Sequence, residues 1–416
     1  MAEPLLVLVA GKDPLDEPGG GHSSYVRAHA RAATAAGFAP HLVAVGRDAA
    51  VRETDFGTIH RARSPHRPLR QLMIPGHARV LAREAVAVVG DHPGPVLLHG
   101  FGVWGAGAVA AADRLRAARP DLAVATAISS YTVYRAEHDS LVRGAAGEPW
   151  RERARYRAQA AWVAAVVDRW ERDAYRRADR VWVNYDSVAR LVVDHHGPEV
   201  QVQRIGYGPE SAFEPLPPPA PVPTPLAAVA PAGTPRLVCI ARHHSRKGVD
   251  VLIEALALLR DRDVAVGAAL VGFGPLLEAH RRRVAALGLD DRVAVTGGVD
   301  AVEPYLAAAD LFVLPSREEQ SGALALLEAQ RLGIAVVASA VDGIPEDVAD
   351  GETGWLVPPG DAGALAEVIA VALADPAARA RVGDGGRRRF AERFAAEPFA
   401  QTLAAAYAGL GIDPGG

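Results

Sequence analysis

Short apolar runs alternate with longer helical patterns along most of the 416-residue chain. Each run has the length of a strand and is bounded by glycine, proline or charged residues, whereas the intervening segments are long enough for helices. This alternation is typical of parallel sheets built from strand–helix–strand units. The chain length favours two domains, and 50% hydrophobic residues are enough for two cores. We therefore expect an α/β protein with two doubly wound, Rossmann-like domains that face each other across a cleft.

The expected elements form two series, separated by a proline-rich segment at residues 214–235. Such a segment suits an extended, semi-rigid linker and neither a helix nor a central strand. We expect one domain at 1–213 and another at 236–395, and the last helical stretch, 398–410, could pack on either. The first series has strands at 5–10, 41–45, 96–99, 122–128, 180–184 and 202–205, and helices at 24–36, 69–89, 105–118 and 150–177. The second has strands at 236–241, 264–271, 292–296, 311–314, 335–339 and 354–357.

Composition excludes several classes of protein. The single cysteine, Cys239, can form neither an intramolecular disulfide nor a multi-cysteine metal site. A net charge of -4 argues against nucleic acid as the main partner, because binding to phosphate backbones needs a clustered basic surface. No signal-peptide pattern and no apolar stretch of roughly 20 residues is present, so we expect a cytoplasmic protein. Peripheral membrane contact through the arginine-rich helix at 150–177 is not favoured, because acidic residues are interspersed in it.

A basic segment, 242–248, lies between an expected strand and an expected helix. Backbone N–H groups and the positive end of the helix would face an anion there, and Arg242 and Lys247 add formal charge. The predicted ligand is a phosphate or diphosphate, and the alternative is a solvated basic turn. His243 and His244 lack a third metal ligand nearby and are expected at the surface.

Lysine is rare in this chain. Only Lys12 and Lys247 are present, and the other residues among the 45 basic ones are arginines. Because lysine is so rare, we expect Lys247 to occupy a position where the compact ammonium of lysine is required and the planar guanidinium of arginine would not serve.

Carboxylates follow the expected strand at 311–314. Glu318 and Glu319 precede Gly322 in a turn, and Glu328 lies within the apolar first turns of the next helix. A carboxylate facing a cleft from that helix could accept hydrogen bonds from sugar or ribose hydroxyls, and burying Glu328 without a ligand or an arginine would be costly. Glu318 or Glu319 could instead be a helix-capping charge.

The first half offers weaker candidates. The loop 19–21 is glycine-rich and could approach a phosphate or sugar closely, but neither it nor 272–275 matches G-x-G-x-x-G, which disfavours a nicotinamide-dependent enzyme. Polar and aromatic residues at 129–138 follow a buried-type strand, where a second substrate would be held. His99 is a further cleft candidate, with a hydrogen-bonded structural histidine as the alternative.

Several segments of the second half, taken in order, resemble family 4 retaining glycosyltransferases, which have the GT-B fold. The first half is similar more loosely, through its glycine loop and residues 171–187. The resembling segments of the second half are 242–248, 270–275, 291–297, 309–316, 327–329, 342–346 and 351–361.

The resemblance implies a nucleotide diphosphate sugar, with a UDP-sugar expected first, as donor on the second domain. It implies that Arg242 and Lys247 neutralise the diphosphate, that Glu319 contacts the donor sugar, and that a final helix at 396–416 returns to the first, acceptor-side domain. The other donor contacts expected are Gly20, Gly21, Gly272, Val299, Gln320, Ser321, Gly322, Ala323, Leu324 and Glu328, the last at the ribose. The expected acceptor contacts are His99, Tyr131, Arg135, Glu137 and His138.

Two departures from the family pattern concern the site. Members typically carry two glutamates separated by seven residues, with a glycine three positions after the first, but Gln320 stands eight positions before Glu328. Glu319 has Gly322 at the expected offset, so a one-residue insertion restores the pattern; we favour Glu319 and keep Gln320 as the alternative. In addition, the family's usual histidine after the fourth strand of the first domain is replaced by residues 129–131.

We therefore expect a retaining glycosyltransferase that needs no metal or other cofactor and transfers a sugar to the hydroxyl of a small sugar, a cyclitol, a lipid-linked glycan or a secondary metabolite. The alternative is a non-catalytic nucleotide-sugar binding protein, which only the Gln320 irregularity supports. A pyridoxal-phosphate phosphorylase is disfavoured, because Lys247 is assigned to phosphate.

Overall fold

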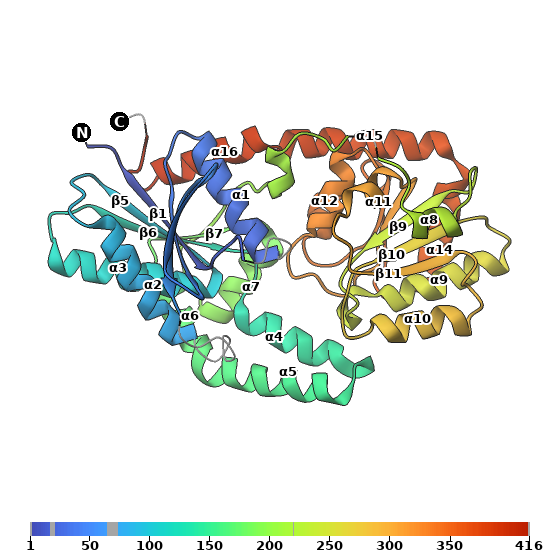
Figure 1. Ribbon diagram of the computed structural model, residues 1–416, viewed down its shortest axis with the longest axis horizontal. Coiled ribbons are helices and arrows are strands. Elements are labelled where there is room, and N and C mark those ends of the chain that lie inside the picture. Colours follow the sequence, from blue (N-terminus) through green and yellow to red (C-terminus); the bar gives the residue numbers. More distant parts are fainter. Residues whose placement is uncertain (1, 17–20, 65–73, 219, 415–416) are drawn as a thin grey trace. The chain divides into compact units, whose positions relative to one another are not determined.

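The computed structural model describes residues 2–16, 21–64, 74–218 and 220–414 (Figure 1). The chain divides into two compact units. The first contains Met1–His138, Ala158–Glu214 and Arg393–Gly416, and the second contains Asp139–Arg157 and Pro215–Glu392. The predicted first domain, 1–213, includes Asp139–Arg157, which this division groups with the second unit. The domain boundaries stay a prediction.

The first unit contains an eight-stranded sheet in the order β3-β4-β2-β1-β5-β6-β7-β8. All neighbouring pairs are parallel except β3 and β4, which are antiparallel. The interior residues of β1 are all buried, as expected for a parallel strand covered on both faces. The strands are β1 (Leu5–Lys12), β2 (His41–Gly46), β3 (Ala50–Thr54), β4 (Gly57–Arg63), β5 (Val96–Phe101), β6 (Val124–Ser130), β7 (Arg180–Val183) and β8 (Val202–Arg204).

Helices cover both faces of this sheet. Helices α2 and α3 pack on one face, where Leu98 of β5 lies in their core, whereas α1 and α16 pack on the other, where His99 of β5 contacts Tyr407 of α16. The chain stays helical from Trp150 to Arg177 through a π-helical turn between α5 and α6. The helices of the first unit are α1 (Gly21–Ala35), α2 (Ile74–Val89), α3 (Gly105–Ala118), α6 (Asp168–Arg177), α7 (Asp186–His196) and α16 (Ala396–Ala408). Two more helices, α4 (Tyr134–Arg143) and α5 (Trp150–Trp162), belong partly to the first unit and partly to the second.

The second unit contains a six-stranded parallel sheet in the order β11-β10-β9-β12-β13-β14. Strand order reverses between β9 and β12, so the loops that follow these two strands meet at one point of the carboxyl edge. The strands are β9 (Arg236–Ile240), β10 (Gly267–Val271), β11 (Val293–Gly297), β12 (Leu311–Leu314), β13 (Val336–Ser339) and β14 (Trp355–Val357).

Different helices of the second unit cover the two faces of this sheet. Helices α9, α10 and α14 share a core with one face, and α8 and α11 share a core with the other. They are α8 (Thr224–Val229), α9 (Val249–Asp261), α10 (Leu277–Ala286), α11 (Glu303–Ala307), α12 (Leu324–Arg331), α13 (Ile344–Asp347), α14 (Ala362–Ala374) and α15 (Pro376–Arg393).

Several local elements differ from the sequence-based expectation, which also lacked α4 and α7. Helix α8 lies inside the segment expected to be an extended linker, because Pro225 is tolerated in the first helical turn and Leu226 and Val229 bury themselves against β10. The β3–β4 hairpin was not expected, because β3 is an exposed edge strand with little apolar alternation. Among the helices of the described residues, none has both the length and the apolarity needed to cross a bilayer.

Candidate active site

The loops after β9 and β12 of the second unit are joined by backbone hydrogen bonds. The amides of Arg317 and Glu318 donate to the carbonyl of Arg246 at 2.7 and 3.2 Å. The Arg317 guanidinium donates to the Ser245 carbonyl at 3.0 Å. The basic segment and the acidic turn, which are about 70 positions apart in the sequence, therefore form one surface at the carboxyl edge of the sheet.

Gly248 allows this close approach. It ends the 3₁₀ turn η6 (Ser245–Lys247) with a φ of 62° and precedes α9. A Cβ atom at this position would lie 1.9 Å from the carbonyl oxygen of Pro315. Only glycine combines the left-handed conformation with that proximity.

Lys247 and Glu319 form an ion pair at the junction of the two loops. The Lys247 Nζ to Glu319 Oε2 distance is 2.5 Å, and the two side chains are 15% and 5% exposed. Ser316 Oγ donates to the other oxygen of Glu319, also at 2.5 Å. Burial lowers the pKa of Lys247, and Glu319 acts in the opposite direction. The two charges that sequence analysis assigned to separate ligand contacts are thus each other's partners in this structure.

Asp342 orients the acidic turn from the loop after β13. Its Oδ2 accepts hydrogen bonds from the backbone amides of Glu319 and Gln320, each at 2.6 Å. Gln320 and Asp342 are both left-handed, with φ angles of 72° and 49°. Non-glycine residues rarely adopt this conformation, and its recurrence at functional sites marks this turn as constrained.

The remaining donor candidates continue the chain from this turn into α12. Ser321, Gly322 and Ala323 connect Gln320 to Leu324, the first residue of α12, and the Ser321 carbonyl accepts a hydrogen bond from the Gly343 amide at 3.3 Å. Glu328 lies one turn into α12 and is half-buried. The structure therefore places these residues in sequence beside Glu319.

Gly272 and Val299 serve packing in this structure. A Cβ on Gly272, whose φ is 144°, would lie 2.0 Å from the Ala241 carbonyl oxygen, so this glycine lets the loop after β10 approach the loop after β9. Arg242 is exposed, and its guanidinium lies 5.3 Å from the Phe273 ring centroid. Val299 packs partly buried in the core beneath α8. Gly20 lies outside the described residues, and Gly21 begins α1.

The two adjacent histidines are not surface residues, which corrects the expectation from the sequence. His243 is 0% and His244 6% exposed. The His243 ring is 2.8 Å from His280 of α10, and that of His244 is 2.6 Å from Glu148. No local pattern indicates either partner, because both lie far from the histidines along the chain.

His99 is a core residue, which favours the structural alternative. Its side chain is 0% exposed, and its ring nitrogens lie 3.0 Å from Tyr407 Oη and 2.8 Å from Ser129 Oγ. Burial lowers its pKa well below the usual range, so the ring is neutral. Tyr131 is half-buried and joins the start of α1, since its hydroxyl is 3.1 Å from His22 Nδ1.

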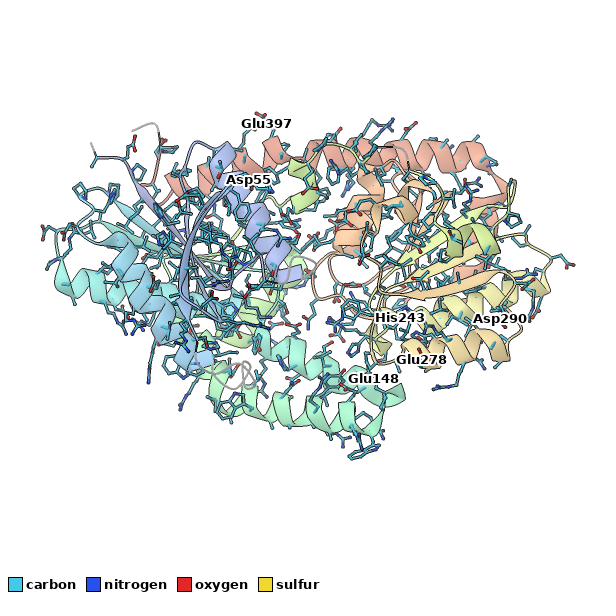
Figure 2. The ribbon with its side chains drawn as sticks, viewed as in Figure 1. Asp55, Glu148, His243, Glu278, Asp290 and Glu397 are labelled. Atoms are coloured by element: carbon cyan, nitrogen blue, oxygen red, sulfur yellow. The ribbon has the colours of Figure 1, made fainter. Side chains whose placement is uncertain are left out.

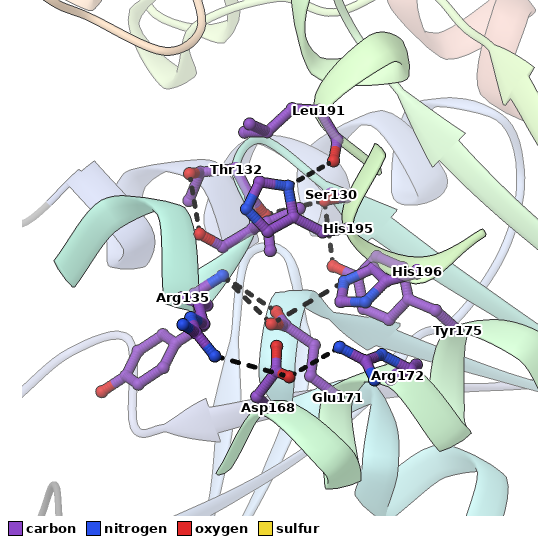
Figure 3. A network of polar contacts seen from close by, with 12 residues as sticks. Ser130, Thr132, Arg135, Asp168, Glu171, Arg172, Tyr175, Leu191, His195 and His196 are labelled. Carbon is purple, nitrogen blue, oxygen red and sulfur yellow. Dashed lines mark hydrogen bonds and ion pairs between the residues drawn. The ribbon is translucent and has the colours of Figure 1, made fainter. Parts of the chain in front are cut away.

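Arg135, Glu137 and His138 lie on α4, a helix that was not predicted from the sequence. The Nδ1–H of His138 donates to the Tyr134 carbonyl at 2.9 Å, so this histidine serves the helix itself. Figure 3 shows the network at the beginning of α4, where Arg135 approaches Asp168 within 4.0 Å.

Glu171 of α6 caps the beginning of α4. Both of its oxygens lie 3.1 Å from the Tyr134 amide, and its side chain is 0% exposed. Burial raises the pKa of Glu171 to about 8, and the nearest histidine, His196 at 3.8 Å, has its pKa lowered by burial to about 3. The hydrogen bonds from the Tyr134 amide to Glu171 thus stabilise the beginning of α4. Of the five residues expected to bind an acceptor, Tyr131, Arg135 and Glu137 are half-buried, and the two histidines are buried.

Comparison with known proteins identifies the second unit. Residues 234–375 match the family described as glycosyl transferases group 1. Residues 234–375 are therefore a group 1 glycosyltransferase domain. A GDP-mannose-dependent alpha-(1-6)-phosphatidylinositol monomannoside mannosyltransferase from Mycolicibacterium smegmatis is 37% identical over 199 residues, which are 44% of this chain and 52% of that protein. Alpha-D-kanosaminyltransferase from Streptomyces kanamyceticus is 30% identical over 180 residues, 43% of this chain and 46% of that protein.

The similarity to these curated relatives spans about half of their length, whereas the fold matches solved glycosyltransferases throughout. Sucrose-phosphate synthase from Thermosynechococcus elongatus superposes with a TM-score of 0.71 at 24% identity, covering 98% of this chain and 99% of that one. HepE from Anabaena in complex with UDP gives 0.67 at 19% identity, covering 98% and 100%. At these identities the similarity shows the fold, which is the GT-B fold predicted from the sequence.

Proposed function

We propose that the protein transfers a sugar from a nucleotide diphosphate sugar to an acceptor hydroxyl, with retention of anomeric configuration and without a catalytic metal. The observation that carries this proposal is the buried Lys247–Glu319 pair at the meeting point of two loops in a group 1 glycosyltransferase domain. A basic group and a carboxylate placed together there supply one partner for a diphosphate and one for sugar hydroxyls.

The diphosphate is held by Lys247 and Arg242, together with backbone amides at the start of α9. When the diphosphate arrives, it replaces Glu319 as the partner of the Lys247 ammonium. The Glu319 carboxylate is then free to accept hydrogen bonds from the donor sugar, while Ser316 and the Asp342-held backbone keep it in place. Glu328, on α12, accepts hydrogen bonds from the ribose hydroxyls, and the turn 320–323 contacts the sugar and phosphates.

The reaction breaks the bond between the anomeric carbon and the phosphate oxygen, whose electron pair leaves with the nucleoside diphosphate. The acceptor oxygen forms the new bond on the same face, and its proton passes to the leaving phosphate. Negative charge grows on that phosphate in the transition state, where Lys247 and Arg242 stabilise it most strongly. Each charge-assisted hydrogen bond contributes about 1.5–3 kcal/mol.

The donor base separates the relatives. The M. smegmatis protein is described as GDP-mannose-dependent, and HepE has been solved with UDP-glucose. We propose a UDP-sugar first and GDP-mannose second. A thermal-shift screen of both against the full chain tests the choice, because a ligand that binds only the folded state raises Tm. The acceptor in this proposal is the hydroxyl of a small sugar, a cyclitol or a secondary metabolite held by the first unit.

Product analysis tests the reaction itself. NMR of the product should show the anomeric configuration of the donor, and excess EDTA should leave the rate unchanged. An inverted linkage, or a rate abolished by EDTA and restored by Mg²⁺ or Mn²⁺, would contradict the proposal.

A further inference from the structure

A helical segment from the first half of the chain packs on the basic loop of the second unit. The segment is Asp139–Arg157, which comprises the end of α4, the turn η3 (Gly144–Gly147) and the first half of α5. Arg143 donates to Glu318 at 3.0 Å. A Cβ on Gly144 would lie 3.2 Å from Ser245 Oγ, so η3 lies directly against η6.

Glu148 is the centre of this contact. Its side chain is 0% exposed, and its Oε1 lies 2.6 Å from His244 Nδ1. The same oxygen lies 3.5 and 3.4 Å from the amide and hydroxyl of Ser245. On the other side of the imidazole, Tyr156 Oη lies 2.9 Å from His244 Nε2. Figure 2 labels Glu148 and, on the loop after β9, His243, the neighbour of His244.

The protons of this cluster follow from its surroundings. Burial lowers the pKa of His244 to about 4, and Arg246, Arg242 and Lys247 act in the same direction, so the imidazole is neutral. A neutral ring has one donor and one acceptor. Nδ1–H therefore donates to Glu148, and Nε2 accepts from the Tyr156 hydroxyl. Both ring nitrogens are engaged, which fixes the orientation of the ring.

The backbone of His244 is part of the turn that presents Lys247. Its carbonyl accepts from the Lys247 amide at 2.9 Å, and its amide donates to the Arg242 carbonyl at 2.8 Å. A fixed His244 ring thus fixes the residue that links the two cations assigned to the diphosphate.

Electrostatics alone would oppose a carboxylate at this place. Glu148 puts negative charge behind a loop that is proposed to bind an anion, and like charges disfavour each other even at effective protein dielectric constants. Removal of that charge alone would strengthen diphosphate binding. A role in geometry accounts for the burial of Glu148 against His244, because the contact would hold the loop in one conformation before the ligand arrives.

We propose that Glu148 is a positioning residue of the nucleotide-sugar site, which acts through His244 to hold the turn carrying Arg242 and Lys247. This inference rests on the proposed function of that turn. It assigns to Asp139–Arg157 a role in donor binding, although this segment lies in the first half of the chain.

Calorimetric titration of the full chain with UDP and with GDP tests the inference, alongside kcat and KM for the donor that is turned over. We expect Glu148→Ala to weaken binding of the nucleoside diphosphate at least tenfold and to raise the donor KM more than it lowers kcat. Glu148→Gln, which can still accept from Nδ1–H, should recover most of the affinity. The matched control is Arg153→Ala, an exposed residue of the same segment, which should bind as the wild type does.

A double-mutant cycle shows whether Glu148 acts through His244. If it does, Glu148→Ala combined with His244→Ala binds no more weakly than His244→Ala alone. Tighter binding by Glu148→Ala, or additive losses in the double variant, would overturn the inference. If Glu148→Ala fails to fold, Tyr156→Phe, which removes only the hydroxyl, must weaken binding and leave Tm within a few degrees of wild type, or the inference falls.

Failure of the proposed function gives a different result. In that case neither UDP nor GDP binds the wild type, or Lys247→Ala binds as tightly as the wild type. Binding that is lost in Lys247→Ala but kept in Glu148→Ala refutes the role of Glu148 alone.

Discussion

The buried Lys247–Glu319 pair predicts a specific pattern of stability and activity in a four-member mutant cycle. The variants are wild type, Lys247→Met, Glu319→Gln and the double variant. At 2.5 Å and an effective dielectric constant of about 20, the attraction between the charges is roughly 7 kcal/mol. Desolvation of the two ions costs several kcal/mol each, so the net contribution of the pair is small.

Removal of one partner leaves the other charge buried, which destabilises by about 3–5 kcal/mol. For a unit of about 200 residues, each kcal/mol shifts Tm by roughly 2–4 °C. We therefore expect Lys247→Met to lower the Tm of the second unit by about 6–20 °C, and the double variant to recover most of that loss. The side-chain amide introduced by Glu319→Gln can still accept a hydrogen bond from Ser316, so little else changes.

Activity should not recover with stability. Loss of one charge-assisted contact to the leaving diphosphate lowers kcat/KM by roughly 10- to 150-fold in Lys247→Met. The double variant, which also lacks the Glu319 carboxylate proposed to contact the donor sugar, should be at least as impaired. Scanning calorimetry and a donor-turnover assay on the same preparations measure the two effects. Additive Tm losses, or a double variant as active as wild type, would refute the assignment of this pair.

Three further predictions concern two other residues of the second unit and one residue of the first. Gly248→Ala should destabilise the second unit by at least about 1–2 kcal/mol, measured by Tm, because alanine is strained at a φ of 62° and its Cβ meets the Pro315 carbonyl; an unchanged Tm would contradict this. Asp342→Gly relieves the left-handed strain but removes the acceptor of two backbone amides, so we expect its donor KM to rise. Asp342→Asn keeps an acceptor oxygen, so a raised donor KM in Asp342→Asn but not in Asp342→Gly would exclude the hydrogen bonds as the cause. Burial raises the pKa of Glu171 from 4.5 to about 8, so between these pH values the folded state keeps the carboxyl proton that the unfolded state has lost. The free energy of unfolding therefore falls as pH rises from 4.5 to 8, by at most about 1.4 kcal/mol per pH unit. Glu171→Gln has no such proton, so urea titrations from about pH 5 to pH 8 should show its stability rising relative to that of wild type; a difference that stays constant with pH would contradict the burial argument.

Sequence patterns predicted the layered fold well, because strand-length apolar runs and helical periodicity are local signals. All six strands of the second sheet appear within a few residues of their expected positions, and β9 is followed by the expected basic turn. Helices α4, α7 and α8 and the β3–β4 hairpin were missed. For α8 and β3 the reason is that a short helix in a proline-rich segment and an exposed edge strand have weak local patterns.

The candidate site was predictable in its residue types but not in its pairings. The segments that carry Lys247 and Glu319 were found, since each follows a strand at the carboxyl edge of the sheet. Their direct contact depends on the reversal of strand order beside β9, which the sequence does not encode locally. Glu148 could not have been found from the sequence, because nothing near it in the chain indicates a histidine partner 96 positions away.

The most direct test of the nucleotide-sugar site is the hydrolysis of UDP-glucose and GDP-mannose, with water as the acceptor. Mass spectrometry measures the nucleoside diphosphate that is released. The comparison is between wild type and the folded variant that combines Lys247→Met with Glu319→Gln. We predict that wild type releases UDP or GDP and that the double variant does so at no more than about a tenth of that rate. Equal rates in the two proteins, at matched Tm, would contradict the assignment of this site.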